Sequence, residues 1–330
     1  MSPSTLPLQM SSAEELWAEV ANTYTIHPET LAATAREMAL AFPSPASVSH
    51  EETRENDRKL HLDVNGTDAP FEGTVEDVDA GGIPASVYRP NSRKSENPAV
   101  MVYFHGGGLM RGSRETYDRT IKALAEQSGV VIVSVEYRLL PCPGDPMAPF
   151  DDALAATRWA MKQRDTLGGA GSKVGVGGDS AGGQLVMGVT HDIESGLDFM
   201  VLVYPTADFN LDLPSCKEFH NTPALNTAAL RWRFGVTNAD IPDAEKNARV
   251  NAAAREVLSS APPAVVLLAQ LDPLRDAGTH LAQRLKEAGV LVRLHTLEGV
   301  PHGFFSMPGV YPSNTAQAYA YISDFLQKFQ

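Results

Sequence analysis

Apolar residues in this chain fall into two patterns, and the patterns alternate from residue 99 onward. Short continuous apolar runs indicate strands that are buried on both faces, whereas longer segments with apolar positions three and four apart indicate helices. The predicted strands span residues 100–104, 130–135, 174–177, 199–204, 264–269 and 291–297. The predicted helices span residues 116–127, 149–167 and 181–193, followed by one that ends near 288 and a last one with an apolar stripe of Ile322, Phe325, Leu326 and Phe329.

The chain ahead of this region has a different pattern. The first dozen residues are rich in Ser and Pro and are expected to be loose, and two helix-like stretches follow at 12–24 and 28–42. A charged segment occupies 50–60. Residues 74–80 and 83–89 have strand character and are joined by Gly81-Gly82, which predicts a β-hairpin.

Short apolar strands alternating with helices predict an α/β fold with a mostly parallel sheet and helices on both faces. Residues 206–260 interrupt this alternation and carry Phe209, Phe219, Trp232 and Phe234. We expect this segment to be an insertion over the carboxyl edge of the sheet, where open α/β sheets bind ligands. Its aromatic side chains could form the core of the insertion or line a substrate pocket.

Composition and charge narrow the classes of partner. The chain has 330 residues, 43% of them hydrophobic and 20% charged, and a formal net charge of −13. This charge argues against nucleic acid or an anionic membrane as the main partner. The N-terminus shows no signal-peptide pattern and no apolar run approaches transmembrane length, so the sequence predicts a cytoplasmic protein. Cys142 and Cys216 do not make a disulfide framework or a C-x-x-C motif.

A candidate nucleophile follows the strand near residue 177. Gly178, Ser180 and Gly182 have the G-x-S-x-G spacing between a strand and a helix. This spacing permits a sharp turn that exposes the serine hydroxyl, and the helix N-terminus offers N–H groups to an oxyanion. The neighbouring Asp179 should point away from the cleft and act as structural support.

A serine nucleophile needs a base and a residue that orients it. His302 comes just after the last predicted strand, and Asp272 comes just after the strand before it. The order Ser180, Asp272, His302 is that of α/β-hydrolases. Asp276 and Glu298 are alternatives for the acid; Asp276 fits better at the start of the following helix, and Glu298 lies on the strand's own end.

A glycine-rich loop, His105–Gly108, follows the strand at 100–104. Its three glycines allow the backbone to turn N–H groups towards a substrate oxygen. Two such donors, with the N–H of Ala181, would hold the oxyanion of a tetrahedral intermediate.

These motifs together resemble the hormone-sensitive lipase-like esterases, in the subgroup with a G-D-S-A-G elbow. The matching residues are His105–Gly108, Glu136–Leu139, Gly178–Gly183, Asp272–Asp276 and His302–Phe304. The likeness runs from about residue 74 to the C-terminus. It implies an α/β-hydrolase fold with an eight-stranded sheet and a helical cap. The catalytic domain would comprise 66–205 and 261–330, with cap contributions from 1–65 and 206–260.

The resemblance also implies a function and a set of roles. Family members hydrolyse carboxylic esters of short to medium acyl chains, through an acyl-enzyme and without metal or cofactor. Ser180 is then the nucleophile, Asp272 the acid and His302 the base. The N–H groups of Gly107, Gly108 and Ala181 would bind the oxyanion, while His105 and Gly106 support the oxyanion loop. One departure from the family is Cys142, which stands where members usually have a supporting glutamate, in a segment that is one residue longer.

Two alternatives use the same fold. The triad could serve an amidase, a lactonase or an acyltransferase. The chain could also be a non-catalytic small-molecule receptor, but such receptors lack the histidine that is present here as His302. The expected partner is a small-molecule ester, and the sequence leaves a homodimer open.

Overall fold

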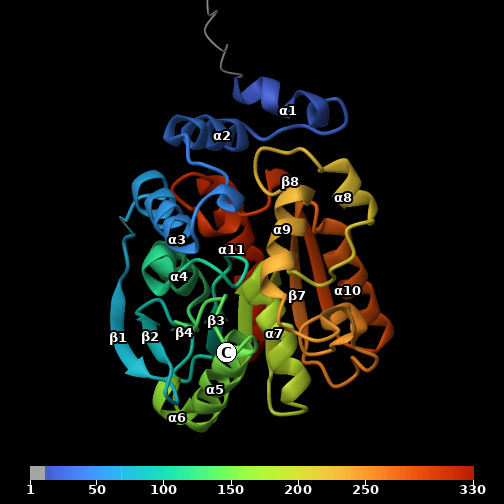
Figure 1. Ribbon diagram of the computed structural model, residues 1–330. Coiled ribbons are helices and arrows are strands. Elements are labelled where there is room, and N and C mark those ends of the chain that lie inside the picture. The colour runs from blue at the N-terminus through green and yellow to red at the C-terminus, as the bar shows by residue number, and fades with distance from the viewer. Residues whose placement is uncertain (1–11, 68) are drawn as a thin grey trace, which may run out of the picture.

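The apolar runs of the sequence form one eight-stranded sheet in the computed structural model, which describes residues 12–67 and 69–330 (Figure 1). The strand order is β1-β2-β4-β3-β5-β6-β7-β8. The β1–β2 and β2–β4 pairs are antiparallel and all others are parallel, so the predicted fold class is confirmed. The strands are β1 (Gly73–Asp79), β2 (Pro84–Pro90), β3 (Val100–Phe104), β4 (Val131–Val135), β5 (Val174–Asp179), β6 (Phe199–Val203), β7 (Ala264–Leu271) and β8 (Val292–Pro301).

The predicted hairpin is formed by β1 and β2. Gly81 and Gly82 make its turn with φ angles of 78° and 91°, a backbone conformation that residues with a Cβ rarely adopt. The expectation of a loose N-terminus concerns residues 1–11, which lie outside the described residues. Ser12 is the N-cap of the first helix, and its Oγ accepts a hydrogen bond from the Glu15 N–H at 3.2 Å.

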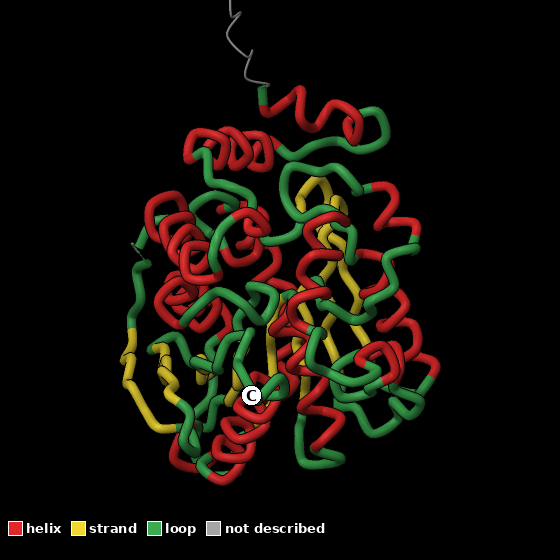
Figure 2. The backbone as a smooth tube through the Cα atoms, in the orientation of Figure 1, coloured by secondary structure: helices red, strands yellow, loops and turns green. Residues whose placement is uncertain are grey.

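Helices cover both faces of the sheet (Figure 2). They are α1 (Ala13–Ala21), α2 (Pro28–Leu40), α3 (His50–Lys59), α4 (Arg114–Ser128), α5 (Ala148–Lys162), α6 (Arg164–Leu167), α7 (Ala181–Asp192), α8 (Pro214–Glu218), α9 (Thr227–Thr237), α10 (Arg275–Glu287) and α11 (Pro312–Leu326). One helix predicted across 149–167 is divided, because Gln163 leaves the helical conformation with φ −95° and ψ 9°. The charged segment at 50–60 forms α3 and continues as a π-helical turn at Leu60–Asn65.

The core has one layer on each side of the sheet. Helices α5, α7 and α10 contribute to one layer, with side chains such as Ala156, Leu185 and Leu281. Helices α4 and α11 contribute to the other, with side chains such as Ile121 and the predicted stripe of Ile322, Phe325 and Leu326. The sheet is therefore held between two apolar layers, which fixes the positions of the strand ends.

The N-terminal helices and the 206–260 segment contact one another. Trp17 of α1 packs in a buried cluster with Phe219, which follows α8, and with Leu271 at the end of β7. The Tyr24 hydroxyl donates a hydrogen bond to the Glu218 carboxylate at 2.7 Å. Figure 1 shows α1 and α2 at the end of the molecule where α8 and β8 lie.

Aromatic residues of the insertion are mainly internal. Phe219 is fully buried, and the rings of Phe209 and Phe234 pack with their centroids 4.9 Å apart. Trp232 is partly exposed. Of the two roles considered for these side chains, a core role therefore fits Phe209, Phe219 and Phe234.

Helix α2 carries a carboxyl group with an unusual environment. Burial raises the pKa of Glu37 to about 7, and the positive charge of Arg111 opposes this shift. A carboxyl group whose pKa is raised in the folded state lowers the stability once the pH exceeds its pKa in the unfolded chain.

The close packing of α7 gives a first prediction. A methyl group on Gly182 would overlap the carbonyl oxygen of Phe104, whereas one on Gly235 of α9 would meet no atom within 4 Å. We expect Gly182→Ala to lower the free energy of unfolding by about 3 kcal/mol. Gly235→Ala should raise it by about 0.5–1 kcal/mol, because alanine favours a helix. Urea unfolding of both variants measures these changes; equal effects of the two substitutions would contradict the prediction.

A second prediction concerns pH. Between about pH 4.5 and pH 7 the unfolded chain loses the Glu37 proton before the folded chain does, so stability from this group falls as pH rises. Glu37→Gln removes this effect. As the pH rises from about 5 to about 8, the free energy of unfolding of the variant should rise by roughly 1–2 kcal/mol relative to that of the natural protein. This is less than the full pKa shift corresponds to, because Glu37 is partly exposed and water screens its charge. Urea unfolding at both pH values tests it, and a pH-independent difference between the two proteins would contradict it.

Candidate active site

The predicted site residues lie directly after four strands of the sheet. His105 follows β3, Ser180 follows β5, Asp272 follows β7 and His302 follows β8. Because these strands are connected through parallel pairs, their carboxyl ends lie at one edge of the sheet. The fold therefore brings residues that are far apart in the sequence to a common place.

Ser180, His302 and Asp272 form a continuous hydrogen-bonded chain. The Nε2 atom of His302 lies 2.8 Å from the Ser180 Oγ, and its Nδ1 atom lies 2.7 Å from the Asp272 Oδ2. Asp272 is fully buried, and its other oxygen accepts a hydrogen bond from the Leu274 N–H at 2.8 Å. The carboxylate is thereby held in one orientation and faces the imidazole.

The turn at Ser180 is strained and is held from both sides. Ser180 has φ 54° and ψ −117°, an unfavourable conformation for a residue with a side chain that costs about 1–3 kcal/mol. Its N–H donates to the Val203 carbonyl at 2.8 Å, and its carbonyl accepts from the Thr206 N–H at 3.0 Å. A methyl group on Gly178 would lie only 2.5 Å from the backbone carbon of Gly182, so the turn requires both glycines.

The glycine loop adopts conformations that favour glycine. Gly107 and Gly108 have φ angles of 107° and 68°. Within residues 12–67 and 69–330, the N–H groups of Gly107, Gly108 and Ala181 have no hydrogen-bond acceptor. The N–H of Gly106 differs, since it donates to the Asp179 carboxylate at 2.9 Å. Three N–H groups thus remain free for a ligand oxygen, and a fourth is occupied in holding the loop.

His105 is a structural part of this loop. Its Nδ1 atom lies 2.8 Å from the Gly106 carbonyl oxygen, and its ring stacks on Tyr137 with centroids 4.3 Å apart. Burial lowers the pKa of His105, which keeps the ring neutral. The hydrogen bonds of His105 go to Gly106 and Tyr137 and not to Ser180, so a supporting role for this residue stays the prediction.

Asp179 points away from the serine and into the interior, as predicted. Its carboxylate accepts hydrogen bonds from the hydroxyls of Tyr103 and Tyr117, both at 2.8 Å, as well as from the Gly106 N–H. Burial raises the pKa of Asp179, and the two tyrosine hydrogen bonds act in the opposite direction. The carboxylate therefore links β3, α4 and the glycine loop to the turn beside Ser180.

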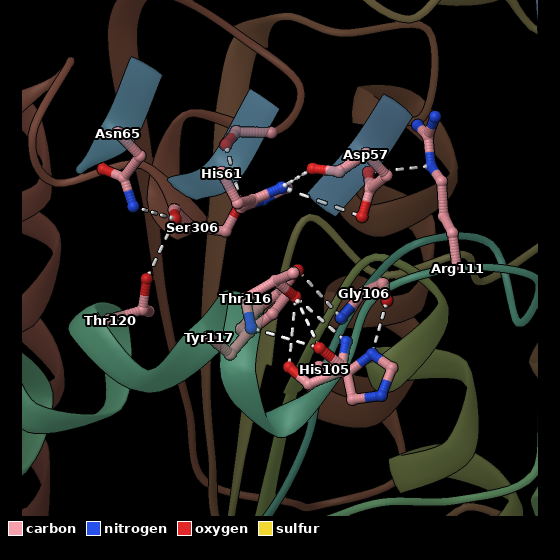
Figure 3. A network of polar contacts seen from close by, with 12 residues as sticks. Asp57, His61, Asn65, His105, Gly106, Arg111, Thr116, Tyr117, Thr120 and Ser306 are labelled. Carbon is pink, nitrogen blue, oxygen red and sulfur yellow. Dashed lines mark hydrogen bonds and ion pairs between the residues drawn. The ribbon is translucent and has the colours of Figure 1, made fainter. Parts of the chain in front are cut away.

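Helix α3 adds charged residues near this loop (Figure 3). The Arg111 Nε atom lies 3.3 Å from the Asp57 carboxylate, and the His61 Nδ1 atom lies 2.9 Å from the Asp57 carbonyl oxygen. Arg54 donates to the carbonyls of Met110 and Leu140 at 2.9 and 3.2 Å. The charged segment at 50–60, which the sequence predicted to belong to the cap contribution of residues 1–65, is thus bound to the residues that follow the glycine loop.

The Cys142 segment is also bound to this loop. The Leu140 N–H donates to the Leu109 carbonyl at 2.7 Å, next to the Arg54 contact with the Leu140 carbonyl. Cys142 itself is partly buried against the apolar core. Backbone contacts and Arg54 therefore hold this region, in which the resemblance to the esterase family led us to expect a glutamate.

The alternative acids do not reach the histidine. Asp276 accepts a hydrogen bond from the Ser215 N–H at 2.8 Å and pairs with Arg275, in the first turn of α10. Glu298 is exposed on β8. Among the acids considered from the sequence, Asp272 is the one that contacts His302.

Sequence reasoning missed one residue that packs against the histidine. Tyr204, predicted as the end of a strand, lies past β6 with φ 32°, and its ring packs 4.5 Å from the His302 ring and 5.7 Å from Phe304. An aromatic residue at a strand end is common in any core, so no local signal distinguishes it.

A hollow of about 370 Å³ lies between the β1–β2 hairpin and α4, and it contains none of the predicted site residues. Within the described ranges, no cluster of three or more His, Cys, Asp or Glu side chains could hold a metal ion. No helix in the described part of the chain is long and apolar enough to cross a membrane.

Comparisons with known proteins agree with this geometry. The sequence matches the family described as alpha/beta hydrolase fold over residues 101–306. The carboxylesterase NlhH of Mycobacterium tuberculosis is 38% identical over 239 residues, covering 70% of this chain and 74% of its own. The ethyl acetate hydrolase of Pseudomonas putida is 33% identical over 241 residues, covering 70% and 74%.

Solved structures of esterases are also similar to this chain. An esterase from Pyrobaculum calidifontis is 31% identical, with a TM-score of 0.78, and the alignment covers 92% of this chain and 99% of that one. An ester hydrolase from the metagenome of Lake Arreo, complexed with a bipyridine phosphonate derivative, is 29% identical with a TM-score of 0.82, covering 92% and 98%. The chain therefore belongs to the alpha/beta hydrolase fold family, among the hormone-sensitive lipase-like esterases.

Proposed function

We propose that this serine carboxylesterase hydrolyses esters of short to medium acyl chains through an acyl-enzyme formed on Ser180. The observation that carries the proposal is the continuous contact from the Ser180 Oγ through the imidazole of His302 to the buried Asp272 carboxylate. The Pseudomonas putida relative, named as an ethyl acetate hydrolase, supports a small ester as substrate.

The first step is attack on the ester carbonyl. His302 Nε2 accepts the proton of the Ser180 hydroxyl as Oγ bonds to the carbonyl carbon, and the carbonyl oxygen becomes an oxyanion. The Asp272 carboxylate accepts the Nδ1–H hydrogen bond, fixes the tautomer and stabilises the imidazolium that forms.

The oxyanion would be bound by the N–H groups of Gly107, Gly108 and Ala181. Their lack of other acceptors supports this role, and one such donor contributes about 3–4 kcal/mol to transition-state stabilisation. His302 then gives its proton to the alcohol oxygen as the ester bond breaks. Water, deprotonated by His302, attacks the acyl-enzyme and releases the acid while Ser180 regains its proton.

The cap is the second part of the proposal. We assign residues 66–205 and 261–330 to the catalytic domain, and residues 206–260 together with the N-terminal segment, 1–65, to the cap. The buried Trp17–Phe219–Leu271 cluster supports this assignment, because it joins the two cap segments at the end of β7. Ser180 is only 3% exposed, which fits a site beneath a cover.

A substitution of the serine tests the nucleophile. Ser180→Ala should lower kcat for ethyl acetate and aryl esters by roughly four to six orders of magnitude, because no other group can form the acyl-enzyme. Labelling by a fluorophosphonate probe, followed by peptide mass spectrometry, should occur at Ser180 and disappear in the variant. Ser313→Ala, at an exposed serine, is the control and should keep both properties.

Retention of most ester turnover by Ser180→Ala would overturn the proposed nucleophile. An unlabelled natural protein without turnover would instead favour the receptor alternative. Product analysis with a competing alcohol or an anilide substrate separates ester hydrolysis from acyl transfer and amide cleavage.

The supporting role of Asp179 gives a further prediction. Asp179→Asn places an amide N–H₂ towards donors from Tyr103, Tyr117 and Gly106, so at least one buried donor loses its acceptor. We expect the free energy of unfolding to fall by about 1–3 kcal/mol and kcat to fall as the loop shifts. Urea unfolding and steady-state kinetics measure these changes.

Tyr103→Phe is the matched comparison, since it removes one donor and leaves the carboxylate with two. Its effects on stability and kcat should be smaller than those of Asp179→Asn. If Asp179→Asn kept the natural stability and kcat, the carboxylate would not hold the loop.

A further inference from the structure

Arg233 of α9 lies directly on the glycine loop. A methyl group on Gly108 would overlap the Cδ and Nε atoms of Arg233 and would lie 2.8 Å from its Cζ. The guanidinium of an insertion residue therefore covers the backbone whose N–H is proposed to bind the oxyanion. Arg231, two residues earlier on the same helix, is exposed.

Arg233 has no acidic partner within the described residues. No Asp or Glu oxygen of residues 12–67 or 69–330 lies within 4.0 Å of its guanidinium, and it donates no hydrogen bond to them. The nearby acids are already engaged. Asp57 pairs with Arg111 at 3.3 Å, and Asp272 accepts from Leu274 while it faces His302.

The electrostatic surroundings of Arg233 are unfavourable for a cation. Burial and, to a lesser extent, the charge of Arg111 lower the pKa of Arg233 to about 9, and the charges of Asp57 and Asp272 oppose this shift. The group is still protonated at neutral pH. A partly buried cation without a partner is costly, and an anionic ligand beside it removes part of that cost.

The type of anion follows from the charges around the site. A guanidinium matches the planar geometry of a carboxylate and can bind it with two parallel hydrogen bonds. Arg111 pairs with Asp57, so within the described residues Arg233 is the one of these two arginines without a carboxylate partner, and a single guanidinium suits one carboxylate better than a phosphate dianion.

We propose that the preferred substrates are esters that carry a carboxylate, and that Arg233 binds this carboxylate while the ester carbonyl sits on the glycine loop. This inference rests on the proposed esterase function and names the substrate class of the same site. The carboxylate could belong to the acyl part or to the alcohol part of the ester, and these two cases are separated by the substrates of the test.

The test compares matched esters. For a carboxylate on the acyl part, monoethyl succinate is compared with ethyl pentanoate, and the release of ethanol is measured. For a carboxylate on the alcohol part, 4-acetoxybenzoate is compared with 4-methylphenyl acetate, and the released phenols are measured by chromatography. The measured quantity is the ratio of kcat/KM for the anionic ester to that for the neutral ester. In Arg233→Gln this ratio should fall about ten- to a hundredfold for at least one pair, as expected for a lost hydrogen bond to a charged group.

Two variants make the result specific. Arg233→Lys keeps the positive charge and should restore part of the ratio, with the recovery mainly in KM. Arg231→Gln removes an exposed arginine of the same helix and should leave the ratio unchanged. Succinate should also inhibit the natural protein competitively, and more weakly after Arg233→Gln.

A ratio that stays within about threefold of the natural value in Arg233→Gln, for both pairs, would overturn the proposal. An equal fall of the ratio in Arg231→Gln would also overturn it, since the effect would then come from the overall positive charge of α9 and not from Arg233. Failure of the esterase function has a different signature, because Ser180→Ala would then match the natural protein on all four esters.

Discussion

The close approach between the first turn of α7 and the end of β3 determines the geometry of the site. Gly182 lies so near the Phe104 carbonyl that a single methyl group would overlap it. This approach places the helix N-terminus, the Ser180 turn and the glycine loop after β3 within one compact region. Any side chain at Gly182 would separate the loop from the serine, and the proposed oxyanion donors would no longer face the same point.

The strained backbone conformation of Ser180 persists because hydrogen bonds from several neighbouring elements hold it in place. The backbone of Ser180 is bonded to Val203 and Thr206, and the neighbouring Asp179 is anchored by two tyrosine hydroxyls. Buried polar groups of this kind are stable only when each donor has an acceptor. Asp179 thus connects the stability of the core to the position of the Gly106 backbone, which lies next to the proposed oxyanion donors.

The guanidinium of Arg233 differs from the charged groups around it in having no hydrogen-bond or ion-pair partner among the described residues. Asp272, Asp179 and Asp57 all have partners, whereas Arg233 lies against the glycine loop without one in the described part of the chain. A protein with a formal net charge of −13 has many carboxylates that could pair with an arginine. Arg233 has no such partner in the described part of the chain although it lies against Gly108, and this is the reason to propose that it binds the substrate.

The sequence alone determined the sheet, the hairpin and the candidate catalytic residues, because these depend on local rules. Burial on both faces produces continuous apolar strands, Gly81-Gly82 permits a tight turn, and the spacing around Ser180 permits one sharp bend. It did not reveal the break at Gln163 or the role of Tyr204 beside His302.

Only the tertiary structure decided which charged residues meet. Asp57 and Arg111 are separated by a long stretch of sequence, and Arg233 and Gly108 by a longer one. In the sequence, each of these charges is consistent with a solvated helix surface or loop. Their partners depend on how α3 and α9 pack over the sheet, and packing is set by the whole chain rather than by neighbouring residues.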